Sequence, residues 1–377
     1  MNQKIARFLA DRAPETPCLV VDLDAIAEAY ELLCRYLSCA KVYYAVKANP
    51  AAEIIAMLAA KEANFDVASP AEIALCLGHG ATPQRLSFGN TIKKEKDIAF
   101  AYAAGVRLYA FDSAAELEKL ARGAPGARVF CRILVSCEGA DWPLSRKFGC
   151  APDMAVGLLQ RARELGLDPY GVSFHVGSQQ TDLGQWDKAV GAVARMFTLL
   201  AEGDISLKMV NIGGGFPAQY RGTIASLPQY AQAVTDALTR HFGNRLPEII
   251  VEPGRSLVGD AGVIQSEVVL IADKGDGGGR RWVYLDVGKF NGLAETMAES
   301  IKYRIEPPAC RCGAPAPVVL AGPTCDSADI LYERTEYRLP EDLAVGDRIA
   351  ILSAGAYTAS YASVGFNGFP PLRTYCI

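Results

Sequence analysis

The chain has 377 residues with a formal net charge of −4, and half of its residues are hydrophobic, which is the composition of a soluble globular protein with room for two domains. Basic residues gather only in the short pairs at 93–94 and 280–281, so we expect no nucleic-acid partner, and no apolar stretch is long enough to span a membrane. Residues 1–17 lack the apolar core of a signal peptide and the 11 cysteines are scattered, so we predict a cytoplasmic location.

The spacing of cysteine and histidine predicts no metal site. Cys310 and Cys312 form a C-x-C pair inside a loop rich in Pro and Gly, and two free thiols are the expected state. The only three histidines stand far apart along the chain, at His79, His175 and His241.

Short β-rich runs alternate with helical stretches through the first two thirds of the chain. A helix is expected near 24–38, and eight strands follow at 41–47, 65–69, 86–90, 108–112, 129–135, 171–177, 209–214 and 249–253. The helices between them are expected near 51–62, 70–79, 93–104, 113–122, 152–165, 183–202 and 228–242. Ser69, Ser113 and Pro152-Asp153 stand where the starts of three of these helices need cap residues.

This alternation predicts an α/β fold with a parallel sheet, and eight units predict a closed (β/α)8 TIM-type barrel over residues 24–255. The alternative is an open doubly wound sheet. Such a sheet would usually carry a Gly-rich dinucleotide loop after its first strand, and the sequence has none there.

A second, all-β domain of Greek-key or sandwich-like type is predicted from residues 1–23 and 256–377. A strand near 18–23 joins it from the N-terminal segment. A hairpin turn is expected at 276–279 and a loop at 305–317. The further strands are expected at 262–272, 281–287, 317–321, 335–339 and 347–352.

Polar residues recur at the carboxyl ends of the eight barrel strands, where such barrels carry their active sites. A single charge at a strand end is usually solvated, but five charged or imidazole-bearing strands that converge on one rim indicate a site. The residues at these ends are Lys47, Asp66, Arg132, His175 with Ser178, Gly213-Gly214-Gly215, and Glu252 with Gly254 and Arg255.

These residue types together suggest pyridoxal phosphate as cofactor. Lys47 follows an apolar strand, and partial desolvation of its ammonium would lower its pKa and favour an imine-forming amine. The triple glycine and Arg255 can bind a phosphate, although a tight turn needs the glycines equally well. Glu252 could hold the pyridine nitrogen protonated, and His175 could stack on the ring.

Seven motifs then occur in a fixed order along nearly the whole chain. They are YYAVKANP (43–50), FDVAS (65–69), SFHVGSQ (173–179), NIGGGFP (211–217), EPGR (252–255), GPTCDSAD (322–329) and GAYT (355–358). In these motifs the chain resembles the fold-type III pyridoxal-phosphate decarboxylases of the ornithine decarboxylase branch, which have a (β/α)8 barrel and a C-terminal β-domain.

The resemblance implies a role for each matching position. Lys47 matches the Schiff-base lysine, His175 the histidine stacked on the ring, and Glu252 the partner of the pyridine nitrogen. Cys325 matches the cysteine that returns a proton to Cα, and Asp326 a carboxylate that binds the distal amine of the substrate. The matching cofactor contacts are Asp66, Arg132, Ser178, Gly213, Gly214, Gly215, Gly254, Arg255 and Tyr357.

The resemblance also implies a homodimer with shared active sites, to which the β-domain contributes. Cys325 and Asp326 would reach the site of the neighbouring subunit, while Lys147 and Asp329 would pair across the interface.

Within segment 292–300, which resembles the substrate-recognition segment of the family, Glu299 is expected to bind the distal amine without the acidic neighbour that the family pattern has. Tyr357 and Phe366 are further expected substrate contacts.

The expected activity is decarboxylation of L-ornithine to putrescine and CO2, a step of polyamine biosynthesis. Lysine decarboxylation stays open because one methylene discriminates weakly. A diaminopimelate decarboxylase would have Cys-Glu at 325–326, an alanine racemase would not carry GPTCDSAD, and arginine decarboxylases of this fold are expected to be much longer. A non-catalytic regulatory homologue would have lost cofactor contacts that are present here.

Overall fold

The structure is a computed structural model that describes residues 1–142, 147–275 and 280–377, and it divides into two compact units. We call Ala27–Pro217 with Ile224–Gly254 the barrel unit. Met1–Ile26, Ala218–Thr223 and Arg255–Ile377 together form the β unit. Residues 218–223 belong to the β unit although they lie, along the chain, between the last two strands of the barrel unit. No feature of the sequence predicted this assignment.

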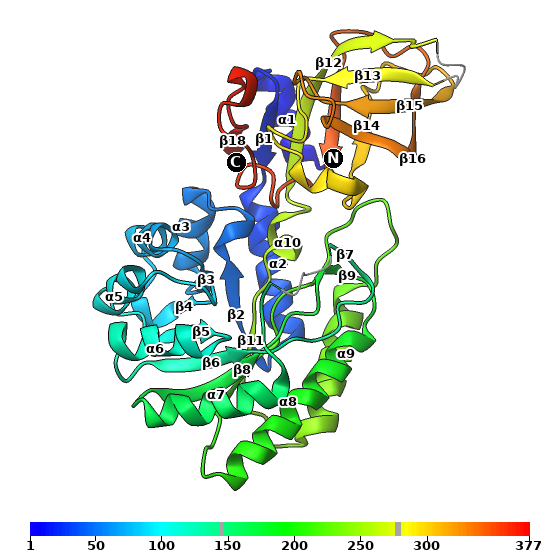
Figure 1. Ribbon diagram of the computed structural model, residues 1–377. Coiled ribbons are helices and arrows are strands. Elements are labelled where there is room, and N and C mark those ends of the chain that lie inside the picture. The colour runs from blue at the N-terminus through cyan, green and yellow to red at the C-terminus, as the bar shows by residue number, and fades with distance from the viewer. Residues whose placement is uncertain (143–146, 276–279) are drawn as a thin grey trace. The chain divides into compact units, whose positions relative to one another are not determined.

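Eight parallel strands of the barrel unit close into a barrel in the order β10-β11-β2-β3-β4-β5-β6-β8 (Figure 1). All eight predicted strands are present, and closure excludes the open-sheet alternative. Their bounds are β2 Ala40–Ala45, β3 Asn64–Val67, β4 Leu86–Phe88, β5 Leu108–Phe111, β6 Arg128–Arg132, β8 Asp168–Ser173, β10 Met209–Asn211 and β11 Glu248–Val251.

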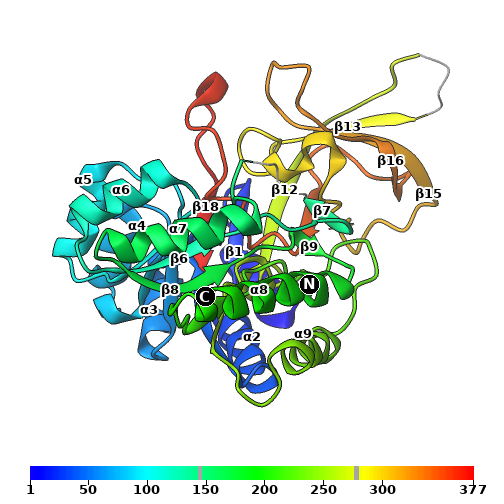
Figure 2. The same cartoon turned by 60° about the horizontal axis from the view of Figure 1, so that its bottom comes forward.

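Helices lie outside the strands, and Figure 2 shows α7, α8 and α9 side by side along the barrel. Ser69 and Ser113 cap α4 and α6 as predicted, because each side chain accepts a hydrogen bond from a backbone N–H of the first turn. The helices are α2 Leu23–Tyr36, α3 Ala52–Ala60, α4 Pro70–Gly78, α5 Glu95–Ala103, α6 Ala114–Gly123, α7 Pro152–Glu164, α8 Gly184–Glu202 and α9 Leu227–Phe242, with the short turns η1 Val46–Ala48 and η2 Pro83–Arg85.

The interior of the barrel is filled by side chains from five strands. Tyr43, Leu108, Phe130, Met209 and Ile250 belong to one buried cluster, and each is at most 5% exposed. A barrel of eight strands is just wide enough for such side chains to fill it, so this centre is a packed core and polar chemistry is left to the rims.

The β unit contains an eight-stranded sheet in which β1 pairs with both β12 and β18. The first and last strands of the chain therefore lie next to each other (Figure 1). Its elements are α1 Gln3–Arg12, β1 Cys18–Val21, α10 Arg255–Val258, β12 Gly262–Ala272, β13 Arg281–Leu285, η3 Ala294–Glu299, β14 Arg304–Glu306, β15 Pro315–Ala321, β16 Ile330–Pro340, β17 Arg348–Leu352, η4 Phe366–Gly368 and β18 Arg373–Cys376.

Several elements were not expected from sequence. The antiparallel pair β7 Ala140–Trp142 and β9 Ser178–Gln180 belongs to the barrel unit, and part of the predicted loop 305–317 belongs to strands β14 and β15. The turn predicted at 276–279 lies outside the described residues. Among the residues that the structure describes, no helix is both long and apolar enough to cross a bilayer.

Candidate active site

Lys47 lies in the tight turn η1 directly after β2. The flanking Val46 and Ala48 are buried, and the hydroxyl of Tyr44 fixes the turn by donating to the carbonyl oxygen of Asn49 at 2.8 Å. The side chain of Lys47 itself is exposed. The partial desolvation expected of its ammonium stays a prediction.

Asp66 and Arg132 lie at the ends of β3 and β6. Burial, and after it the negative charge of Glu252, holds the pKa of Asp66 well above its usual range, while the charges of Lys47 and Arg132 lower it. Burial also lowers the pKa of Arg132. Oδ1 of Asp66 is buried and has no hydrogen-bond partner among the described residues. A buried acceptor of this kind is costly unless a ligand group satisfies it.

His175 follows β8 and is held as a neutral imidazole. Burial lowers its pKa well below the usual range, and the positive charges of Arg132 and Lys47 add to this effect. The backbone N–H of Gly177 donates to Nδ1 of His175 at 3.0 Å, which requires an unprotonated Nδ1. The ring is therefore fixed in orientation and carries no charge near neutral pH.

The glycines after β10 pack closely against neighbouring strand ends. A Cβ at Gly213 would lie 2.4 Å from the carbonyl oxygen of Phe174, and one at Gly214 would lie 2.6 Å from that of Glu252. Gly213 and Gly215 also have positive φ angles of 67° and 98°, which only glycine adopts easily. Close approach and backbone conformation together explain why this loop is made of glycine.

Asn211 connects this loop to Glu252, and sequence reasoning missed it. Its Nδ2 donates to Oε1 of Glu252, and its Oδ1 accepts from the backbone N–H of Gly213 at 2.9 Å. The backbone N–H of Glu252 in turn donates to the carbonyl oxygen of Gly213 at 2.8 Å. The signal was available, because Asn211 is a polar residue at the end of an apolar strand.

These barrel-unit residues fit pyridoxal phosphate. A glycine loop that a side chain would fill can bring its amides to a phosphate, and a neutral imidazole can lie against an aromatic ring. The buried unpartnered oxygen of Asp66 is available to a polar group of a ligand. Glu252, held by Asn211, is a carboxylate that a pyridinium nitrogen could bind.

In the β unit, Arg255 is buried against Glu295, a residue that the sequence did not single out. Its two terminal nitrogens donate to the two carboxylate oxygens at 2.7 and 2.6 Å, and one also donates to the hydroxyl of Tyr220 at 2.7 Å. The guanidinium lies 4.9 Å from the ring centre of Tyr357. Arg255 is thus rigidly held in the β unit, next to another of the expected phosphate contacts.

Glu299 binds the backbone of its own unit. Its carboxylate accepts from the backbone N–H groups of Glu333, Arg334 and Thr335 at 2.9, 2.8 and 2.7 Å. Burial alone would raise the pKa of Glu299, but these hydrogen bonds outweigh burial and lower it to about 2. The predicted contact with a substrate amine stays a prediction, and Glu299 would have to make it beside these bonds.

Cys325 and Asp326 are exposed on the loop between β15 and β16. The backbone N–H of Cys325 donates to Oδ1 of Asn367 at 2.9 Å, which links this loop to η4. Asp329, the third expected residue of the loop, is buried and accepts from the hydroxyl of Thr324 at 2.6 Å. The buried Asp329 therefore anchors the loop, and Cys325 and Asp326 are exposed on it.

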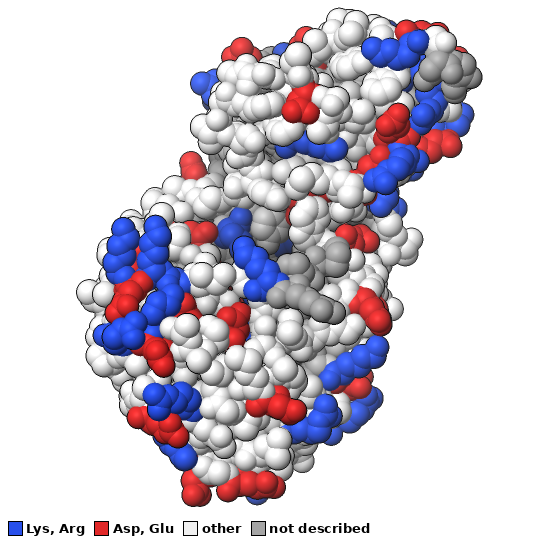
Figure 3. All heavy atoms as spheres, viewed as in Figure 1, with Lys and Arg blue, Asp and Glu red and all other residues white. Residues whose placement is uncertain are grey.

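Phe366 in η4 is 37% exposed, with its ring centre 4.6 Å from that of Phe290. Lys147 of the barrel unit is exposed, and its ammonium lies 4.9 Å from the ring centre of Phe148. On the face drawn in Figure 3, Lys and Arg side chains stand among Asp and Glu side chains on both units.

Comparison with known proteins gives consistent matches. Residues 23–259 match the family model of the pyridoxal-dependent decarboxylase, pyridoxal binding domain. The lysine/ornithine decarboxylase of Selenomonas ruminantium is 33% identical over 370 residues, which cover 98% of this chain and 91% of the relative. A crystal structure of SrLDC with pyridoxal phosphate and cadaverine has a TM-score of 0.89 and 31% identity, and the match covers 100% of this chain and 94% of that one.

The arginine decarboxylase of Paramecium bursaria Chlorella virus, solved with agmatine, has a TM-score of 0.90 at 26% identity, and the match covers all of both chains. The expectation that an arginine decarboxylase of this fold would be much longer is therefore wrong for this relative. Length does not separate the present chain from an arginine decarboxylase.

Fold and site together define a pyridoxal-phosphate enzyme with a (β/α)8 barrel and a separate β unit. The chain belongs to the fold-type III pyridoxal-phosphate-dependent decarboxylase family, as the match over 23–259 and the relative covered over nearly its full length show. It is an amino-acid decarboxylase, and the relatives named above are decarboxylases of basic amino acids.

Proposed function

We propose that this chain decarboxylates L-ornithine to putrescine and CO2 in polyamine biosynthesis. The observation that carries the proposal is the exposed Cys325-Asp326 pair, on a loop that the buried Asp329 anchors. This pair offers a proton donor beside a carboxylate. A carboxylate at this position suits the second amine of a basic amino acid. The names of the relatives support the same substrate class.

The barrel unit would hold the cofactor. When bound, pyridoxal phosphate supplies an electron sink for the charge that remains at Cα after CO2 leaves. Lys47 would bind its aldehyde carbon, Glu252 would keep a proton at the pyridine nitrogen, and the neutral ring of His175 would stack on one face. The remaining expected cofactor contacts are Asp66, Arg132, Ser178, Gly213, Gly214, Gly215, Gly254, Arg255 and Tyr357.

In a homodimer, residues of the β unit would bind the substrate and return a proton to it. Cys325 would return a proton to Cα of the substrate in the neighbouring subunit, and Asp326 would bind the distal amine there. Exposed apolar side chains in the segment before η4, whose Asn367 bonds to this loop, support an interface, since Val364 is 85% and Tyr361 45% exposed. Glu299, Tyr357 and Phe366 are the further proposed substrate contacts, and Lys147 and Asp329 are the proposed pair across the interface.

Lysine is the second candidate substrate. The relative from Selenomonas ruminantium bears both substrates in its name, and the SrLDC structure holds cadaverine. Lysine has one methylene more than ornithine, and one methylene is worth only about 1 to 3 kcal/mol of discrimination in a pocket.

The test is CO2 release by the purified, cofactor-loaded protein with ornithine, lysine, arginine and diaminopimelate compared under identical conditions. Preference for ornithine in kcat/KM supports the proposal, and preference for another substrate corrects it. No CO2 release together with no visible absorbance from bound cofactor would favour a non-catalytic homologue, whereas absorbance without CO2 release would favour a substrate outside this set.

A further inference from the structure

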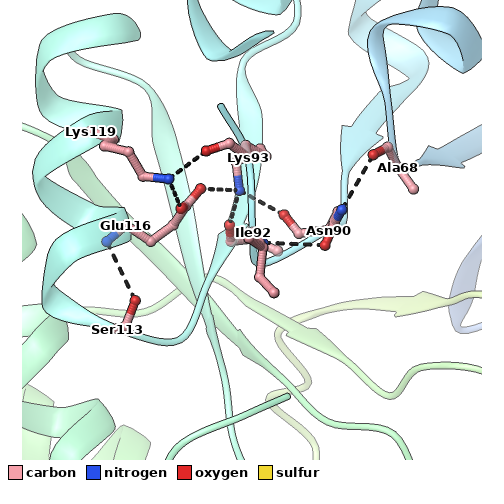
Figure 4. Close-up of polar contacts among 8 residues, drawn as sticks. Ala68, Asn90, Ile92, Lys93, Ser113, Glu116 and Lys119 are labelled. Atoms are coloured by element: carbon pink, nitrogen blue, oxygen red, sulfur yellow. Dashed lines mark hydrogen bonds and ion pairs between the residues drawn. The ribbon is translucent and has the colours of Figure 1, made fainter. Parts of the chain in front are cut away.

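The barrel unit contains a buried ion pair between Lys93 and Glu116, neither of which is among the site residues described above. The side chain of Lys93, in the loop after β4, is 0% exposed, and Glu116 near the start of α6 is 4% exposed. The ammonium of Lys93 lies 3.0 Å from Oε1 of Glu116 and donates to the carbonyl oxygens of Asn90 and Ala110 at 2.6 Å each (Figure 4). Two carbonyl oxygens therefore accept hydrogen bonds from the ammonium, and Glu116 supplies the opposite charge.

The cluster is completed by Lys119, whose ammonium lies 2.5 Å from the second oxygen of Glu116 and donates to the carbonyl oxygen of Lys93. Burial lowers the pKa of Lys93 to about 8 even though Glu116 opposes this shift. Burying two charges is costly, so such a pair is weak evidence for a role in stability alone. The loop from β4, the end of β5 and the start of α6 meet here, at the rim that also carries Lys47 and Asp66.

Loop 89–93, which the contacts of Lys93 hold in place, packs against Asp66. The backbone N–H of Gly89 donates to the carbonyl oxygen of Val67 at 3.0 Å, and a Cβ at Gly89 would lie only 2.0 Å from Oδ1 of Asp66. That oxygen has no hydrogen-bond partner among the described residues. The position of the Asp66 carboxylate therefore depends on packing against Gly89 more than on bonds of its own.

We propose that Lys93 is a positioning residue, which together with Glu116 fixes loop 89–93 and thereby sets the orientation of Asp66 toward the cofactor. The inference rests on the proposed function only in taking Asp66 as a cofactor contact. Asn90 strengthens the link, because its side chain donates to the carbonyl oxygen of Ala68, two residues after Asp66, at 3.4 Å.

The test is the double variant K93M/E116L, which removes both charges and leaves neither buried alone. We expect a melting temperature of the cofactor-free protein within a few degrees of wild type, a dissociation constant for pyridoxal phosphate raised about 10-fold, and a shifted pH dependence of the visible absorbance of the bound cofactor. The matched control is R122M/E95L, which removes an exposed ion pair between α6 and α5 and should leave all three unchanged.

The variant Gly89→Ala tests the packing of loop 89–93 against Asp66 directly. Its backbone is not left-handed, so the added methyl group acts through Asp66, and we expect the same direction of change in cofactor affinity and absorbance. This variant also carries the test if K93M/E116L fails to fold. Wild-type affinity and absorbance in either folded variant would overturn the inference alone, whereas a wild-type protein that binds no pyridoxal phosphate would overturn the proposed function and this inference with it.

Discussion

The barrel unit and the β unit present their site residues in different ways. His175 and Glu252 in the barrel unit are each fixed by a neighbouring polar group of the same unit, namely the backbone of Gly177 and the amide of Asn211. Cys325 and Asp326 in the β unit are exposed on a loop. The difference fits the proposal that one chain organises the cofactor contacts by itself, while Cys325 and Asp326 act on a second copy of the chain.

The largest expected effect is in the barrel unit. Lys47→Ala should remove the visible absorbance of the lysine-bound cofactor and lower kcat by about 10⁴-fold or more, because no other amine would hold the cofactor in place. Absorbance titration and CO2 release measure both effects. Lys96→Ala, an exposed lysine on α5, is the control, and an unchanged visible band in the Lys47 variant would refute the assignment.

Cys325→Ala should behave differently, because it leaves the barrel unit intact. We expect full cofactor binding, a loss of about 10²- to 10³-fold in putrescine formation, and diversion of turnover to misprotonated products. Product analysis by chromatography and mass spectrometry measures the diversion. Cys312→Ala, also an exposed cysteine of the β unit, serves as control, and a normal putrescine yield from the Cys325 variant would exclude the proton-donor role.

Mixing the two inactive variants tests whether the two units act across subunits. If sites are shared, random exchange of Lys47→Ala and Cys325→Ala subunits restores about a quarter of wild-type activity, because half of the dimers then contain one complete site of two. Activity is assayed after incubation under conditions that allow subunits to exchange. No recovery, although exchange is verified with differently tagged subunits, would place Cys325 in the site of its own chain.

The smallest expected effect concerns Glu299. Because its folded-state pKa of about 2 is below its ordinary value, its stabilising contribution is present above about pH 4.5 and is lost as pH falls toward 2. Glu299→Gln should reduce the free energy of unfolding at neutral pH by about 1 to 3 kcal/mol and weaken this acid dependence. Urea unfolding at several pH values measures the free energy of unfolding and its dependence on pH.

Glu336→Gln, an exposed carboxylate on β16, is the control for that series. Unchanged stability of the Glu299 variant together with a raised KM for ornithine would show instead that Glu299 acts mainly on the substrate.

Much of the fold could be predicted from sequence because each barrel strand is a short β-rich run that ends in a polar residue or is followed within two residues by a polar or glycine residue. Strand β14 shows where this fails: of Arg304, Ile305 and Glu306 only one is apolar, and its pairing with β17 at the edge of the sheet depends on a segment more than 40 residues away. The β7–β9 pair is equally short and joins two segments that alternation alone does not connect.

The candidate site was predictable to the same extent. Position at a strand end identified Lys47, Asp66 and His175, since the carboxyl ends of barrel strands share one rim. The pairing of Arg255 with Glu295 spans 40 residues and follows from tertiary packing, so residue type alone could not reveal it. The backbone partners of Glu299 were hidden for the same reason.

The pairing of β1 with β12 and β18 has a consequence for synthesis on the ribosome. Val21 pairs with Gly262 and with Cys376, so an early strand cannot enter its sheet until much later residues have been made. At about 5 to 20 residues per second, Val21 waits roughly 10 to 50 seconds for its first partner. All eight barrel strands emerge before that partner, so nascent-chain proteolysis should find the barrel resistant while β1 is still cleavable.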